Sequence, residues 1–269
     1  MKKLPDFSFE KRLWKKDYKF VAGCDEVGRG CFAGPVVTSC VVFQKNTFDT
    51  FDTFGTSDAF PKIDDSKKLS AVQRERAAKW IKKNSLAWGI GVGKVSEINR
   101  LGMSKATYSA FRRSITIANK KTGSRVDYLL IDAFYIPYVR GLRIPLKTLR
   151  LRSGQAKKFG DLEISGRQLA IIDGDEKSLS IAAASIIAKV YRDRLMESLS
   201  KKSKFKKYGW DKNKGYGTKK HQEAILRHGI TKFHRKKFIE SFLLKANHYQ
   251  LTNHNYFSSF FSSPTQWKT

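Results

Sequence analysis

The sequence predicts an α/β fold in which helices flank a mixed β-sheet, followed by a basic helical C-terminal region. Short apolar runs rich in Val, Ile and Leu alternate with longer segments of helical periodicity over the first 200 residues, and this order is typical of α/β domains. Three of the apolar runs end directly in an acidic residue, and beyond residue 200 the chain becomes strongly basic.

The same patterns assign the strands and helices in order. After a charged lead-in over residues 1–19, we expect strands at 20–24 and 35–43, a polar loop at 45–65, a helix at 70–83, a strand at 86–95, a helix at 105–118, strands at 126–131 and 169–172, and a long Ala- and Ile-rich helix at 179–199. Ser70 and Gln73 form a capping-box pair, which predicts where the first of these helices begins. The inner face of that helix should carry Val72, Ala77, Trp80 and Ile81.

The C-terminal part has a different composition. Residues 201–245 carry 15 Lys and Arg against three acidic residues. Their pattern predicts short helices, one capped by Thr218 and ended by Gly229, and the next capped by Thr231. The following residues are rich in Asn, Ser and Phe, which predicts disorder. We therefore expect a core at 1–200, a basic helical region at 201–245 and a disordered tail at 246–269.

The charge balance predicts a polyanionic partner. Lys and Arg total 53 against 24 Asp and Glu, so the net charge is +29. A globular protein keeps such an imbalance at an electrostatic cost, and a nucleic acid is the partner that offsets it best. A merely solubilising surface seldom needs charge of one sign. A basic membrane-binding protein would show an amphipathic basic helix with a bulky aromatic face, and no such helix stands out here.

The cysteines and the apolar segments indicate where the protein resides. Cys24, Cys31 and Cys40 lie in one mostly apolar region without CxxC spacing, which favours a reducing compartment over disulfides or zinc. The N-terminus becomes charged before any apolar core could form, unlike a signal peptide. The longest charge-free apolar stretch, residues 178–188, is too short to span a bilayer. These features predict a soluble, cytoplasmic protein.

The segment Asp25–Gly30 (DEVGRG) is the strongest chemical signal in the chain. It places two carboxylates beside a glycine loop whose backbone amides can approach a ligand closely. Carboxylate oxygens suit Mg²⁺ or Mn²⁺, and two such ions about 4 Å apart are a common device for cleaving phosphodiesters. Asp132 and Asp175 also follow predicted strands. The pattern therefore predicts a metal-dependent enzyme that acts on a phosphate-bearing substrate.

Adjacent residues of a regular strand point to opposite faces of a sheet. Asp25 and Glu26 can therefore converge only if the strand ends or bulges beside them. The glycines at 28 and 30 favour such an ending.

Several blocks of the sequence together resemble ribonuclease HII, the type 2 ribonuclease H. The blocks occur in the order of that family: Asp25–Gly30, Asp65–Ser70, Leu130–Asp132, Ile181–Val190, Lys214–Thr218 and His234–Phe238. They span roughly residues 20–240, so chance similarity is remote. The resemblance implies an RNase H-like core. It also implies cleavage of the RNA strand of RNA–DNA hybrids and incision 5′ of single ribonucleotides in duplex DNA, leaving a 3′-hydroxyl and a 5′-phosphate.

The resemblance also implies roles for individual residues. Two Mg²⁺ or Mn²⁺ ions would be held by Asp25, Glu26, Asp132 and Asp175. Gly28, Arg29 and Gly30 would contact the 2′-hydroxyl and the flanking phosphate, because the 2′-hydroxyl is what separates RNA from DNA. Tyr216 would stack on the deoxyribose that follows the ribonucleotide. Contacts with phosphate are the further expectation for Lys67, Lys68 and Lys189, against the alternative of solvated or capping lysines.

The chain departs from the family pattern in three places. Asp173 stands where the family commonly has a lysine two places before Asp175, so Asp173 or Glu176 are alternative ligands. A basic insertion at 140–158 is expected to form a hairpin or loop near the substrate. The segment Gln250–Phe257 resembles a sliding-clamp-binding peptide, although Asn253 stands where such peptides have an aliphatic residue. A tail without a partner is the alternative for that segment.

Other functions remain open from the sequence alone. A noncatalytic nucleic-acid-binding protein would need only the basic charge, with the acids incidental. Another nuclease on the same core, such as a resolvase or the type 3 ribonuclease H, is a second alternative. We expect the histidines of the C-terminal region (His221, His228 and His234) to be solvated or near phosphate rather than to bind zinc, and the protein to be a monomer.

Overall fold

The computed structural model describes residues 4–45, 61–144 and 166–252, and it confirms the predicted α/β architecture. A five-stranded mixed sheet has the strand order β3-β2-β1-β4-β5. The strands are β1 (Val21–Val27), β2 (Val36–Val42), β3 (Ala87–Gly93), β4 (Tyr128–Asp132) and β5 (Gln168–Ile171). The helices of the core are α1 (Ser8–Trp14), α3 (Ala71–Asn84), α4 (Val95–Leu101), α5 (Met103–Thr122) and α6 (Leu179–Ser200), with the 3-10 turn η2 (Gly174–Glu176) before α6.

The order of the strands brings several strand ends to one edge of the sheet. β1, β2 and β3 form an antiparallel meander, and β1, β4 and β5 run parallel to one another. In the parallel pairs Cys24 lies opposite Ile131, and Asp132 lies opposite Ile171. The residues that follow Cys24, Ile131 and Ile171 are therefore delivered to the same edge.

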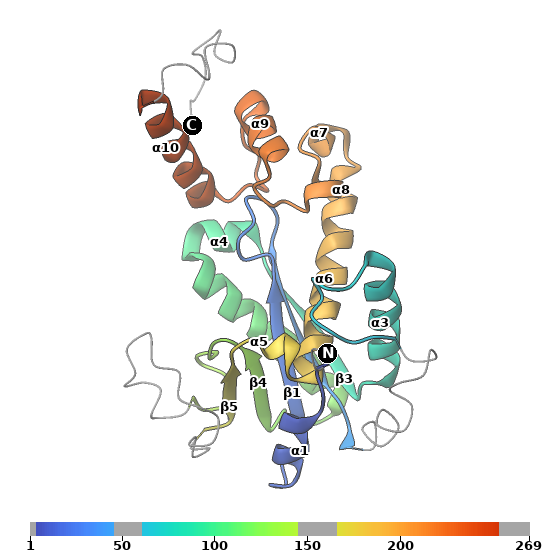
Figure 1. Ribbon diagram of the computed structural model, residues 1–269. Helices are drawn as coiled ribbons and strands as arrows, with labels where there is room; N and C mark the ends of the chain where they lie inside the picture. The colour runs from blue at the N-terminus through green and yellow to red at the C-terminus, as the bar shows by residue number, and fades with distance from the viewer. Residues whose placement is uncertain (1–3, 46–60, 145–165, 253–269) are drawn as a thin grey trace.

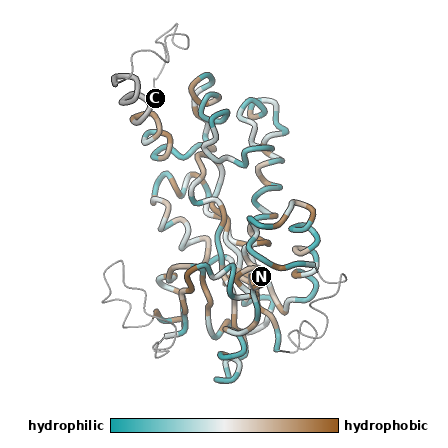
Figure 2. Tube along the Cα trace, viewed as in Figure 1, coloured by the Kyte–Doolittle hydropathy of each residue, from teal (hydrophilic) through white to brown (hydrophobic). Residues whose placement is uncertain are grey.

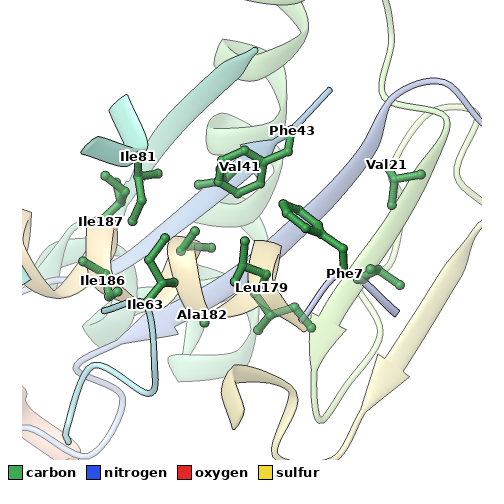
Figure 3. Close-up of a cluster of buried hydrophobic side chains, with 14 of the residues drawn as sticks. Phe7, Val21, Val41, Phe43, Ile63, Ile81, Leu179, Ala182, Ile186 and Ile187 are labelled. Atoms are coloured by element: carbon green, nitrogen blue, oxygen red, sulfur yellow. The ribbon is translucent and has the colours of Figure 1, made fainter. Parts of the chain in front are cut away.

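Helices cover both faces of the sheet, because apolar side chains of the strands point to each face. Val21 and Val41 pack with α6, α3 and α1 in one core cluster, whereas Cys24 and Val42 pack with α5 in another. Figure 3 shows side chains of the first cluster converging from α3, α6, the strands and Phe7, which precedes α1. Figure 2 shows the same division along the chain, with hydrophobic segments in the sheet and hydrophilic turns on the outer helices.

The C-terminal region continues from the end of α6 and lies above the sheet in Figure 1. It contains α7 (Ser203–Lys206), α8 (Trp210–Asn213), α9 (Lys219–His228) and α10 (Lys236–Thr252). Its own apolar cluster joins Trp210 and Ile225 to Met196 on α6 and Ala33 after the glycine loop. The proposed boundary at residue 200 coincides with the end of α6, and the division into domains stays a prediction. Within the described ranges no helix combines the length and hydrophobicity that crossing a membrane requires.

Some local predictions need correction. Val72 is 78% exposed, because it lies on the outer side of the first turn of α3, while Ala77 and Ile81 are buried as expected. Thr231 does not cap a helix, since the next one begins at Lys236, after a turn. That helix runs to Thr252, past residue 246 where we expected the tail to begin, and residues 253–269 lie outside the described part, so a disordered tail stays a prediction. The sequence reasoning also missed the short helices α1 and α4.

The packing of β1 against α6 yields a testable consequence. A Cβ atom on Gly23 would lie 2.1 Å from the backbone carbon of Ser180, so only glycine lets the strand and helix approach this closely. Gly23→Ala should lower the free energy of unfolding by about 2 kcal/mol or more, the cost of overpacking a core that cannot relax. Chemical denaturation followed by circular dichroism measures this. Gly30→Ala is the matched control, because its Cβ would meet nothing within 4 Å, and equal stability of the two variants would contradict the argument.

Candidate active site

The parallel strands bring acidic side chains from distant parts of the chain together. Asp25 and Glu26 lie on β1, and Asp132 is the last residue of the neighbouring strand β4. Asp175 lies in η2, in the loop between β5 and α6. The charges of Glu26, Asp132 and Asp175 all act on Asp25, so these four carboxylates share one electrostatic environment at this edge of the sheet.

The two neighbouring acids on β1 reach this environment in an unexpected way. We expected the strand to end or bulge at Asp25, but β1 continues to Val27 in unbroken register with β2. The pairing with β4, however, stops at Cys24 and Ile131. Beyond that point β1 has no neighbour on its β4 side within the described part of the chain. Side chains from both faces of β1 can therefore border the space beyond the end of β4.

Hydrogen bonds fix the positions of these carboxylates. The side chain of Asp25 accepts a hydrogen bond from Ser185 on α6 and, through Oδ1, one from the backbone N–H of Glu26 at 2.7 Å. Asp132 Oδ1 accepts from the backbone N–H of Gly174 at 2.8 Å. This last bond ties the end of β4 to the turn that carries Asp175. The acidic groups are thus placed by the backbone of the core rather than by flexible loops.

Burial and mutual repulsion make the charged state of this cluster costly. Burial, followed by the charges of Glu26 and Asp132, raises the pKa of Asp25 well above its usual value. Burial raises the pKa of Glu26 to about 7, although Arg29 opposes the shift. Burial and the charge of Asp65 raise the pKa of Asp175 to about 6. The pKa of Asp132 is also raised, mainly by burial. The cluster therefore has too little positive charge nearby to offset its negative charge.

Two basic side chains supply part of that charge. Arg29 Nη1 lies 3.3 Å from Glu26 Oε1, and its guanidinium also lies over the ring of Phe134. Lys67 Nζ lies 3.6 Å from Asp175 Oδ2. Partial burial alone would lower the pKa of Lys67, but the nearby carboxylates, Asp175 first, raise it. Both side chains are substantially exposed and so remain accessible to a ligand.

The donor set fits divalent cations of the Mg²⁺ type. Glu26 Oε2 is buried and has no hydrogen-bond partner among the described residues, which leaves an anionic oxygen directed at no donor. No group of three His, Cys, Asp or Glu side chains in the described ranges is arranged as it stands to hold a metal ion. Mg²⁺ usually keeps several waters and takes one or two carboxylates together with substrate phosphates, so a carboxylate oxygen without a donor is a suitable ligand for it.

Asp65 belongs to this environment, and the sequence reasoning did not assign it a role. It is 7% exposed, and its charge and a hydrogen bond between the two carboxyl groups both raise the pKa of Asp175. Its Oδ1 also lies 3.9 Å from Lys67 Nζ and accepts from the backbone N–H of Lys67. The signal was present in the sequence, because Asp65 opens the same short block as Lys67. It was missed because Asp65 follows a polar loop and not a strand.

The other predicted residues near the acids have partners of their own. Lys68 Nζ lies 2.7 Å from Glu176 Oε1, so both of these residues are engaged beside Asp175 and not directly in the cluster. Asp173 adopts a left-handed backbone conformation at the start of η2, and its charge acts on Asp132. Lys189 lies further along α6 and pairs with Asp193 at 2.9 Å. The structure therefore brings Lys67 to the acids but not Lys189.

The glycine loop is anchored to the C-terminal region by two buried arginines. Gly28 has a φ of +93°, and a Cβ atom there would lie 2.2 Å from the Arg192 guanidinium. Arg192 donates to the carbonyl oxygens of Ala33, Pro35 and Lys214. Arg235 donates to the carbonyl oxygens of Arg29 and Gly34. Because their carbonyls are bound from inside, the loop residues are held in one conformation beside the acids.

Tyr216 lies on the same side of the molecule as this loop. It is 40% exposed, and the Arg192 guanidinium lies 5.9 Å from the centre of its ring. The expectation of solvated histidines is wrong for His221 and His234, which are 0% and 1% exposed. Apolar and aromatic side chains of the C-terminal cluster cover them, a burial that the basic composition of this region concealed.

Comparisons with known proteins agree on one family. The family model described as Ribonuclease HII matches residues 22–241. The ribonuclease HII of Caldanaerobacter subterraneus subsp. tengcongensis is 38% identical over 244 residues, covering 90% of this chain and 84% of the relative. Two solved structures share the fold. The PCNA:RNase HII complex from Archaeoglobus fulgidus has a TM-score of 0.55 at 24% identity, covering 82% of this chain and 94% of the other. Bst-RNase HIII in complex with Mn²⁺ has a TM-score of 0.54 at 21% identity, covering 79% and 63%.

The electrostatics of the acidic cluster predict how the stability of the folded protein responds to metal. In chelator, Asp25→Asn should be at least as stable as the parent protein, because it removes a repelling charge and keeps the oxygen that accepts from Glu26. Saturating Mg²⁺ or Mn²⁺ should stabilise the parent protein, by about 2.7 kcal/mol at 100 times the Kd, and should stabilise the variant much less. Thermal unfolding with and without metal measures both effects. A variant that is clearly less stable than the parent in chelator would contradict the repulsion argument.

Proposed function

The chain belongs to the ribonuclease HII family and is a metal-dependent ribonuclease H endonuclease, and we propose that it incises duplex DNA 5′ of embedded ribonucleotides as well as cleaving the RNA strand of hybrids. The observation that carries the proposal is the convergence of four carboxylates beside the anchored loop Gly28–Gly30. The products would carry a 3′-hydroxyl and a 5′-phosphate. Membership of the family makes a noncatalytic binding protein the weaker alternative.

We assign the metal ions to Asp25, Glu26, Asp132 and Asp175. Two Mg²⁺ or Mn²⁺ ions held there would supply charge that stabilises the attacking and leaving oxygens of the phosphodiester. The protein's contribution is to hold the carboxylates fixed before substrate arrives, through Ser185 and the Gly174 backbone. The mutual repulsion of the acids supports this assignment, because divalent cations would relieve it. The Mn²⁺ complex of Bst-RNase HIII is consistent with the same choice of ion.

The loop and the tyrosine would read the junction between RNA and DNA. The backbone amides of Gly28, Arg29 and Gly30 can meet a 2′-hydroxyl that DNA lacks. Arg29, half-exposed and next to Glu26, would contact the flanking phosphate. Tyr216 would stack on the deoxyribose that follows, since a flat ring packed against that sugar leaves no room for another hydroxyl.

Basic side chains would guide the phosphate backbone toward the acids. Lys67 is 79% exposed and faces Asp175, so it is the lysine best supported as a phosphate contact. Lys68 and Lys189 could contribute only by leaving Glu176 and Asp193, respectively. Most of the basic insertion at 140–158 lies outside the described residues, and its contact with substrate stays a proposal. The large excess of basic residues supports binding of a polyanion in general.

Three further proposals concern the cellular setting. The protein would act as a monomer in the cytoplasm. It would also contact a sliding clamp through its C-terminal end, as the Archaeoglobus fulgidus relative was solved with PCNA. The segment at 250–257 resembles a clamp-binding peptide, and its residues from 253 onward lie outside the described part.

A single assay tests the proposed activity. Duplex DNA with one ribonucleotide should be incised 5′ of that residue in Mg²⁺ or Mn²⁺ and not in chelator. Asp25→Asn should lower the rate by about 10² or more, because it weakens the hold on the ions whose positive charge would stabilise the transition state. Denaturing electrophoresis of labelled strands measures the site and rate of incision. Binding without cleavage in either metal would refute the proposal, and Asp17→Asn, which changes an exposed acid of the N-terminal segment, is the matched control.

A further inference from the structure

Two buried histidines form a pair in the C-terminal region, outside the acidic cluster. His221 lies on α9 and His234 in the turn before α10, and neither is exposed to solvent. Their ring centres are 5.4 Å apart, and both rings pack against Tyr208 and Trp210. Neither histidine has a role in the function proposed above.

The contacts of His221 determine where its proton lies. Trp210 Nε1–H can only donate, and it lies 3.1 Å from His221 Nε2. The Nε2 atom is therefore the acceptor, and a neutral ring carries its proton on Nδ1. His221 Nδ1 lies 2.8 Å from the backbone oxygen of Tyr216 and donates to it. The direction of both hydrogen bonds follows from the tryptophan alone.

The contacts of His234 continue the same sequence of bonds. Its Nε2 lies 3.3 Å from His221 Nε2, which carries no proton, so His234 must be the donor. Its Nδ1 is then an acceptor, and the backbone N–H of Thr231 donates to it at 2.9 Å. The hydroxyl of Thr231 lies 3.0 Å from the same atom. Every polar atom of the two rings has a partner, and His221 Nε2 shares its single lone pair between the donors Trp210 and His234.

The histidine pair lies between the loop Gly28–Gly30 and Tyr216, which are the two parts of the site proposed to recognise the RNA–DNA junction. On one side, His234 bridges to Ala33, and the adjoining Arg235 donates to the carbonyl oxygen of Arg29. On the other side, His221 binds the carbonyl oxygen of Tyr216, which also accepts from Thr218 N–H. Hydrogen bonds, together with the chain segment His234–Arg235, thus link the glycine loop to the residue proposed to stack on the deoxyribose.

We propose that His221 and His234 are positioning residues that hold Tyr216 at a fixed distance from the loop Gly28–Gly30, and so set the preference of the enzyme for ribonucleotide–deoxyribonucleotide junctions. The inference rests on the proposed function, because it concerns the residues assigned there to reading the substrate. The loop would bind the 2′-hydroxyl, and the ring would pack on the next sugar. Together they can select an RNA–DNA junction only if the distance between loop and ring is fixed to within a fraction of an ångström.

The surroundings keep both rings neutral. Burial lowers the pKa of His221, and burial together with the neighbouring His221 lowers the pKa of His234 to about 4. A second proton on His221 Nε2 would face the N–H groups of Trp210 and His234, and one on His234 Nδ1 would face Thr231 N–H. The bond directions deduced above therefore persist at neutral pH.

The experiment compares two substrates for the same set of variants. His221→Gln can still accept from Trp210 at the Nε2 position but loses the donor to Tyr216. It should lower kcat/KM about tenfold on duplex DNA with one ribonucleotide, the size of one lost stacking contact. On a long RNA–DNA hybrid its kcat/KM should stay within about twofold of the parent, because the next sugar there is a ribose and the stacking does not operate. Tyr216→Ala should change the ratio of kcat/KM between the two substrates in the same direction. The double variant His221→Gln/Tyr216→Ala should change that ratio little more than Tyr216→Ala alone.

Controls separate positioning from folding. His228→Gln changes an exposed histidine on the same helix and should leave the ratio unchanged. His221→Asn places an amide N–H near the Nδ1 position and should restore most of the ratio, which keeps the test open if His221→Gln does not fold. An equal loss on both substrates, or an unchanged ratio in His221→Gln, overturns the inference while leaving the proposed function intact. Absence of metal-dependent incision by the parent protein overturns the proposed function itself.

Discussion

Buried negative charge at the edge of the sheet is the constraint on which the rest of the structure depends. Carboxylates that repel one another in a low-dielectric setting do not stay together unless the surrounding fold holds them. Here the strands β1 and β4 fix three of them, and a bond from Gly174 to Asp132 fixes the turn of the fourth. The close contact of Gly23 with α6 brings Ser185 to Asp25. Core packing thus supplies the stability that the site itself lacks, a common relation between scaffold and site.

The C-terminal region has a different structural role, because it holds the exposed glycine loop in a fixed conformation. Three segments far apart in sequence meet there: residues 28–35, 214–217 and 231–235. The buried guanidiniums of Arg192 and Arg235 bind carbonyl oxygens of the first two segments, at Arg29, Ala33, Gly34, Pro35 and Lys214. Several carbonyl dipoles directed at one cation compensate much of its lost hydration. The amides of Phe32, Ala33 and Gly34 are bound as well, by the carbonyls of Gly215 and Phe233, so this segment is held through both kinds of backbone group.

Sequence reasoning was most successful where one physical rule dominates. Hydrophobic periodicity predicted every strand of the described sheet and the helices α3, α5 and α6. Apolar runs followed directly by acids predicted that Asp25 and Asp132 lie at one edge of the sheet. It failed where tertiary contacts decide. The continuation of β1 to Val27 depends on its partner β2, and Asp65 enters the cluster only because its loop folds back onto Asp175. The burial of His221 and His234 depends on Trp210 and Tyr208, whose positions follow from the end of α6.

The strong basic charge of the chain and its negative site act on a nucleic acid over different distances. Exposed lysines and arginines attract phosphates from afar, but salt screens that attraction beyond about 8 Å at physiological ionic strength. At the site itself, buried carboxylates are screened far less, and they repel the same phosphates that the surface attracts. A phosphodiester can therefore approach Asp25 and Asp132 closely only when cations lie between them. Binding of metal and binding of substrate must then strengthen each other by the same factor, because coupling free energies are reciprocal. Under the proposed assignment, the acids that are costly to the folded protein would be what makes substrate binding depend on metal.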